Sequence, residues 1–142
     1  MSNTDTSPIT ISTTVSLPVA KVWDYFSDPK HIVNWNNASD DWHTPSSEND
    51  LRVGGKFVNT MAAKDGSASF NFEGFYTEVE NHKLIAYKLG DERKVRIEFS
   101  EEDGATKMVE TFDPEQTHSR EMQQGGWQAI LDNFKKYAEQ NG

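Results

Sequence analysis

The chain contains no cysteine, few basic residues and no long apolar run. Without cysteine it has no disulfide framework, no thiolate nucleophile and no thiolate metal ligand. Lys and Arg together number 14 against 23 Asp and Glu, so the net charge is −9 at pH 7. Phosphates and anionic lipid headgroups repel such a surface, and we therefore expect neither nucleic acid nor a membrane as a partner.

The motifs of several enzyme classes are also missing. The sequence has no glycine-rich phosphate loop, no nucleophile elbow and no Ser-His-Asp order. Its acids and histidines lack the regular spacing of metal ligands, and we expect no metal and no other cofactor. Residues 1–8 are polar, which predicts a disordered lead-in without a signal segment and hence a cytoplasmic protein.

What the chain does contain is enough for one domain with a sizeable core. It has 142 residues, and we expect a single domain over residues 9–142. Only 35% of the residues are apolar, but 4 Trp, 4 Tyr and 8 Phe supply a large buried area per residue.

The hydrophobic pattern predicts a strand, two short helices, a series of strands and one long helix. Residues 9–17 alternate as in a strand, Pro18 and Pro29 suit the first positions of two helices, and residues 36–50 form a polar loop. Further strands are expected at 56–63, 67–79 (with a bulge or bend at Gly74), 83–89, 93–100 and 105–112. Helices segregated on an antiparallel sheet define an α+β class.

The terminal helix is the clearest element. It is expected to begin near residues 117–119, and its apolar stripe consists of Trp127, Ile130, Leu131, Phe134 and Ala138. Gly125 and Gly126 disfavour a helix, so they permit either a kink within it or a regular start only at Trp127. One helix across a curved sheet of six to seven strands can enclose a cavity.

At this point the chain resembles a known family. Its motifs are Val19-Ala20-Lys21-Val22-Trp23, Pro29 to Trp35, Arg52 to Phe57, Gly74 to Val79 with Lys83 to Tyr87, and Gly126-Trp127. In this order they are similar to the START and birch-pollen-allergen superfamily, and more narrowly to the family related to the C-terminal domain of the activator of the 90-kDa heat-shock protein ATPase. The resemblance covers about residues 9–140 and implies a helix-grip fold: a curved sheet wrapped on the long terminal helix.

A cavity between helix and sheet must be filled. An empty one of about 300 Å³ would cost about 7 kcal/mol, comparable to the whole stability of a domain. A small apolar or aromatic ligand would fill it; alternatively, side chains fill the space as core. The candidate lining residues are Trp35, Trp42, His43, Phe57, Phe72, Tyr76, Tyr87, Phe99, Glu110, Phe112 and Trp127.

Glu110 is the most specific candidate. It alternates with Met108 and Phe112, and if that face points inward a carboxyl enters an apolar pocket, where burial raises its pKa. The alternative places Val109 inward and Glu110 in solvent. Asp40, Asp41 and His43 beside Trp42 suit a solvated loop, a ligand contact at the mouth of the pocket or, least of the three, a metal site. Trp42 is expected to cover the mouth of the pocket together with Trp35.

Three functions follow. The first is binding of a small apolar or aromatic, lipid-like or polyketide-like molecule. The second is a cyclase-like or hydrolase-like enzyme that uses Glu110 and His43 as acid and base. The third, implied by the resemblance alone, is a co-chaperone-like interaction domain that contacts the chaperone. We favour the first, and the sequence leaves open whether any turnover occurs.

Overall fold

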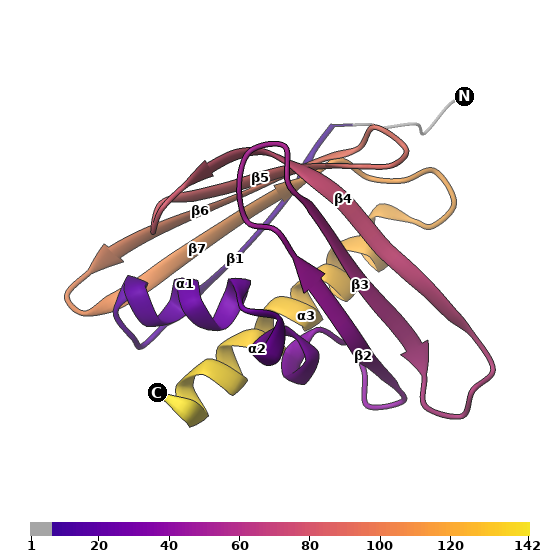
Figure 1. Cartoon of the computed structure of the whole chain (residues 1–142), viewed down its shortest axis with the longest axis horizontal. Coiled ribbons are helices and arrows are strands. Elements are labelled where there is room, and N and C mark those ends of the chain that lie inside the picture. Colours follow the sequence, from indigo (N-terminus) through magenta and orange to yellow (C-terminus); the bar gives the residue numbers. More distant parts are fainter. Residues whose placement is uncertain (1–6) are drawn as a thin grey trace.

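The computed structural model describes residues 7–142, and there the predicted α+β helix-grip architecture is confirmed. Seven antiparallel strands form one curved sheet in the order β1-β7-β6-β5-β4-β3-β2, and the helices pack on its inner side (Figure 1). The strands are β1 (Ile9–Val15), β2 (Trp42–Asn49), β3 (Lys56–Ala63), β4 (Ser69–Glu80), β5 (Leu84–Leu89), β6 (Lys94–Glu102) and β7 (Ala105–Phe112). The expected lead-in, apart from Ser7 and Pro8, lies outside the described residues.

The helices are α1 (Val19–Ser27), α2 (Pro29–Trp35) and α3 (Arg120–Asn141). The two short ones start as the sequence predicts: Pro18 precedes α1, and the Asp28 side chain accepts a hydrogen bond from the Lys30 backbone N–H at 3.0 Å. Both lie beside α3 on the same side of the sheet (Figure 1). Among residues 7–142, no helix is both long and apolar enough to cross a membrane.

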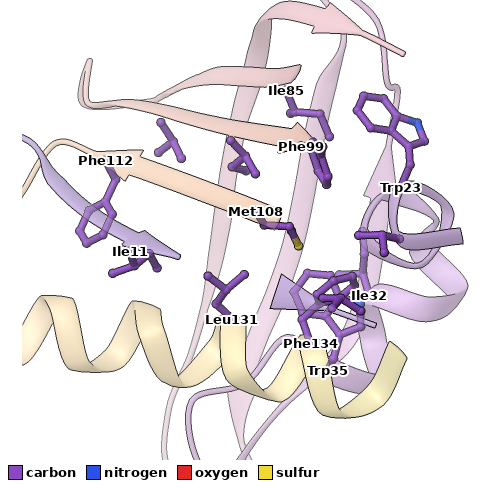
Figure 2. Close-up of a cluster of buried hydrophobic side chains, with 14 of the residues drawn as sticks. Ile11, Trp23, Ile32, Trp35, Ile85, Phe99, Met108, Phe112, Leu131 and Phe134 are labelled. Atoms are coloured by element: carbon purple, nitrogen blue, oxygen red, sulfur yellow. The ribbon is translucent and has the colours of Figure 1, made fainter. Parts of the chain in front are cut away.

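The long helix α3 lies across the inner face of the sheet. It begins after Ser119, whose hydroxyl accepts a hydrogen bond from the Met122 N–H at 3.1 Å. Gly125 and Gly126 lie inside it, so a regular start only at Trp127 is the wrong alternative. Leu131 and Phe134 are buried and point toward the strands, where Met108 lies (Figure 2). The inward side of the second half of α3 therefore packs against the core through Leu131, Phe134 and Ala138.

The prediction of a polar loop over residues 36–50 is wrong in its second half. Residues 42–49 form β2, an edge strand that pairs only with β3. Pro45 lies where the register of β2 against β3 shifts. An edge strand tolerates proline and polar side chains because the backbone groups along its outer edge pair with no further strand. The buried Thr44 hydroxyl donates to the Asn36 carbonyl at 2.6 Å and ties the strand to the end of α2.

The irregularity expected at Gly74 lies elsewhere in β4. The register shifts between Tyr76 and Glu78, while Gly74 pairs regularly with Phe57 and Leu89. Gly74 is needed for a close approach: an added Cβ would lie 2.5 Å from the Lys88 carbonyl and 3.1 Å from the Phe57 ring. The glycine thus lets the Phe57 ring approach the backbone of β4 closely.

Candidate ligand-binding cavity

A cavity of about 320 Å³ lies between the strands, α2 and the first half of α3. If it were dry and empty, it would destabilise the fold by about 8 kcal/mol at the slope measured for engineered core cavities. Its wall includes carboxyl, hydroxyl and amide groups, and polar cavities of this kind hold water or a ligand. Phe70, one of its lining residues, is 50% exposed, so the cavity reaches the surface there.

Aromatic rings form most of one wall. On β3, β4 and β5, the Phe57 centroid lies 4.7 Å from that of Tyr87 and 5.5 Å from that of Tyr76. Phe72 bridges to the helix, because its ring contacts Trp127 at 6.0 Å between centroids. Edge and face contacts of this kind leave flat apolar surfaces exposed to the cavity, which suit a flat or apolar molecule.

Glu110 on β7 points into this cavity, as the inward alternative predicts. Its cross-strand neighbours are Ile11 on β1 and Ile97 on β6, both buried on the inner face. Glu110 is only 7% exposed, and within the described residues no hydrogen bond or ion pair reaches its carboxyl. Burial raises the pKa of Glu110 from 4.5 to about 8, so the group is mostly neutral at pH 7.

Tyr87 and Tyr76 differ in their partners. The Tyr76 hydroxyl donates to the Asn49 amide oxygen, and the Asn49 amide nitrogen donates to the Ser27 carbonyl at 2.6 Å. Tyr87 also lines the cavity, but within residues 7–142 its hydroxyl has no hydrogen-bond partner. Burial, and secondarily the nearby Glu110, raises the pKa of Tyr87 well above its usual value. Tyr87 therefore remains a neutral donor.

The lining contains seven of the eleven residues that the sequence suggested, namely Trp35, Phe57, Phe72, Tyr76, Tyr87, Glu110 and Trp127. Four others lie outside it. Phe99 packs against Trp23 at 5.2 Å between centroids, and Phe112 lies under Trp127 as part of the core. For these two, the alternative of core filling holds.

Trp42 and His43 are the remaining two, and they lie outside the lining, at the start of the edge strand β2. Trp42 is half-buried and covers the ring of Phe70 at 5.9 Å between centroids. His43 is exposed and pairs through its backbone with Ala62. The predicted cover by Trp42 and Trp35 together is therefore wrong: Trp35 is deeply buried and donates its indole N–H to the Tyr25 carbonyl at 3.0 Å.

Sequence reasoning missed several polar lining residues. Arg93 follows the turn after β5, where the sequence predicts only the start of a strand, yet its side chain lines the cavity while its Nε donates to Asp91 at 2.7 Å. Asn49 and Asn59 were missed because residues 36–50 were interpreted as a loop and because an asparagine in a strand has no strong directional signal. The Asp91-Glu92-Arg93 turn gave no sign of its inward side chain.

A separate acidic group lies on α1 and α2, away from the cavity. Ligand atoms of Asp24, Asp28 and His31 lie within 4.8 Å of one another, and Asp24 is exposed. His31 is half-buried, and its Nδ1 lies 2.7 Å from the Tyr137 hydroxyl. This histidine links α2 to α3.

These features define a helix-grip domain of the START type, with a cavity between sheet and helix that reaches the surface and with a buried carboxyl. Residues 16–139 match the family model described as "Activator of Hsp90 ATPase homolog 1-like protein". The chain belongs to this family. No curated protein matches the sequence.

Solved structures support the same assignment. An AHSA1-like protein of Aeromonas hydrophila is 46% identical, with 94% of each chain covered and a TM-score of 0.87. Chr148 of Cytophaga hutchinsonii is 53% identical, with 94% of this chain and 92% of that chain covered and a TM-score of 0.81. A protein of Nitrosomonas europaea is 19% identical over 96% of each chain, with a TM-score of 0.82, and shows the fold alone.

Proposed function

We propose that the protein binds a small apolar or aromatic molecule in the cavity between the sheet and α3. The observation that supports this most is an aromatic wall facing a buried carboxyl with no partner in the described chain. Within residues 7–142 no side-chain nitrogen or oxygen is both sealed off and unpaired, so the Glu110 oxygens border the open space of the cavity, where water or a ligand can satisfy them. A function that uses the group explains why it is there.

The size of the cavity limits the ligand. Its volume of about 320 Å³ is at the lower end of the range typical for small-molecule sites. A molecule of two or three fused rings, or a short acyl chain, fits better than a membrane lipid with two long chains. Displacing water from the aromatic wall supplies about 25 cal/mol per Å² of apolar area removed from solvent.

The enzyme alternative loses its acid–base pair. Glu110 lines the cavity, but His43 lies exposed on the edge strand, so the two do not converge. Glu115, another carboxyl in the lining, accepts hydrogen bonds from the His118 backbone N–H and from its ring at 2.6 and 2.9 Å. The remaining pair, Glu110 and Tyr87, provides two donors and no general base at pH 7.

The family match favours a second candidate, a co-chaperone-like contact. Large exposed hydrophobic side chains are available at Val53, Phe70, Phe75 and Met122. Phe70 and Phe75 are five residues apart on a regular stretch of β4, so their side chains point to opposite faces of the sheet. These two rings therefore do not belong to one exposed apolar patch. Titration of the protein with the 90-kDa chaperone, followed by calorimetry, tests this candidate, and saturable heat would support it.

Chemical-shift mapping tests the main proposal. The ligands are flavonoid-like, polyketide-like and fatty-acid molecules, and the expected result is a set of shift changes around Glu110, Tyr87 and Trp127 for at least one class. Ile130→Trp, which fills the cavity from α3, should abolish these changes. Met122→Trp adds the same bulk to an exposed position of the same helix and should preserve them. Absence of cavity shifts for every class contradicts the proposal.

A further inference from the structure

Some polar side chains of the cavity have hydrogen-bond partners within the protein, and others do not. Several side-chain acceptors are already occupied: the Asn49 oxygen by Tyr76, the Asn59 oxygen by Ser47 at 2.6 Å, and the Glu115 carboxylate by His118. By contrast, the Tyr87 hydroxyl and the Glu110 carboxyl have no partner within residues 7–142. The unused capacity of the cavity therefore includes two O–H groups, those of Tyr87 and of neutral Glu110, together with the side-chain amide of Asn36.

The surroundings of Glu110 keep it in the donor form. Beside it on the sheet are Ile11 and Ile97, and the facing part of α3 supplies Trp127, Ile130 and Leu131, all apolar. The other titratable or charged groups in the lining are Tyr76, Tyr87, Arg93 and Glu115. Arg93 and Glu115 already have partners in Asp91 and His118, and burial leaves Glu110 with a pKa of about 8. A neutral carboxyl supplies one O–H donor, which the ionised form lacks, and keeps an acceptor oxygen.

We infer that the ligand presents an oxygen acceptor, a ketone or similar carbonyl on a flat apolar skeleton, to the Tyr87 hydroxyl and the Glu110 carboxyl. This inference rests on the proposed function and adds the chemistry of the ligand to it. The aromatic wall of Phe57, Phe72 and Trp127 takes the skeleton, and the two donors fix its orientation. A tyrosine hydroxyl and a carboxyl kept neutral by burial form a donor pair of the type found in ketosteroid isomerase, a standard example of this chemistry.

A cationic ligand is the main competitor, because a lone carboxylate and aromatic rings attract ammonium groups. It would require Glu110 to lose its proton, and it would leave the Tyr87 O–H without an acceptor. Arg93 in the same lining adds a positive charge that an ammonium group would meet. The donor set therefore favours an oxygen acceptor over a cation.

Three probes with one skeleton separate these chemistries. They are 2-acetylnaphthalene, with a carbonyl; 2-isopropylnaphthalene, the apolar analogue of the same shape; and 1-(2-naphthyl)ethylamine, the cation. Affinity is measured by calorimetry at pH 6 to 9. We expect the ketone to bind about tenfold tighter than the hydrocarbon at pH 7, the ratio that corresponds to about one net hydrogen bond. Its affinity should fall above pH 8, approaching tenfold per pH unit, as Glu110 ionises.

Variants assign the effect to the two donors. Glu110→Gln retains an N–H donor, so the ketone should still bind tighter than the hydrocarbon, now without the loss above pH 8. Glu110→Leu and Tyr87→Phe each remove one donor and should reduce the ketone preference severalfold. Glu98→Gln, on the outer face of β6, is the matched control and should behave like the wild type.

Each result decides between the two proposals. If no probe binds, the proposed function fails and this inference fails with it. If the hydrocarbon binds as tightly as the ketone, the inference is overturned while the proposed function stands. An affinity for the amine that exceeds that for the ketone and rises with pH also overturns it, in favour of an ionised Glu110. A ketone preference that disappears in Glu110→Leu supports it.

Discussion

The indole of Trp127 on α3 stacks on the ring of Phe112 at the end of β7, with centroids 4.0 Å apart and planes inclined by 8°. Phe112 is held in the sheet between Ile9 and Val95, so the stack fixes the first half of α3 against three strands. Trp127 also lines the cavity next to Phe72. One contact thus closes the core and shapes the ligand site.

The contributions of Phe112 and Trp127 to the free energy of unfolding should be coupled. In a double-mutant cycle of Phe112→Leu and Trp127→Leu, each single change is expected to destabilise by about 2 kcal/mol, and the coupling to be about 1 kcal/mol, the usual value for an aromatic pair. Urea unfolding measures all four proteins. The control cycle pairs Phe112→Leu with Trp23→Leu, at the other end of the core (Figure 2), and should show additivity. Additivity in the first cycle would contradict a direct role for the stack.

Glu110 should make stability depend on pH. Its pKa is raised in the folded state, so between pH 4.5 and about 8 the folded protein holds a proton that the unfolded chain releases. Its contribution to stability is therefore present below pH 4.5 and is lost as the pH rises, by up to about 1.4 kcal/mol per pH unit.

Comparison with Glu110→Gln isolates the pH-dependent contribution of the Glu110 carboxyl to stability. The free energy of unfolding of the variant minus that of the wild type should increase steadily from pH 5 to pH 8, because only the wild type has the titrating carboxyl. The same difference for Glu98→Gln, on the outer face of β6, should stay flat. A flat difference for Glu110→Gln as well would mean that the carboxyl is ionised or solvated in the native state.

Two glycines should respond oppositely to alanine. Gly74→Ala places a methyl group against the Lys88 carbonyl and the Phe57 ring, and we expect a loss of about 2 kcal/mol or more with a displaced Phe57. Gly125→Ala, within α3, meets no atom within 4 Å and should stabilise by about 1 kcal/mol through helix propensity. Thermal unfolding checks both; a harmless Gly74→Ala would show that Gly74 lies less close to the Lys88 carbonyl and the Phe57 ring than described.

The sequence predicted those elements whose hydrophobic pattern is unambiguous. The β1 alternation and the α3 stripe depend on local periodicity, and both are where the pattern places them. The edge strand β2 was missed because an edge strand needs no apolar alternation, and its Pro45 and serines have the composition of a loop.

The direction of Glu110 is a different kind of problem. Apolar residues occur on both faces of β7, so the sequence of this strand alone does not decide whether Val109 or Glu110 points inward. Pairing with Ile11 and Ile97 on the neighbouring strands decides it, and pairing is a property of the whole sheet. His43 failed as a partner for the same reason, since its distance from Glu110 is set by strand order and not by spacing.

The most direct test of the account is the position of a bound molecule. In a nuclear Overhauser experiment on the complex with 2-acetylnaphthalene, we expect cross-peaks from the probe to the Trp127 indole, the Leu131 methyl groups and the Tyr87 ring, all of which line the cavity. Cross-peaks confined to exposed side chains such as Val53 and Phe75, or none at saturating probe, would contradict ligand binding between the sheet and α3.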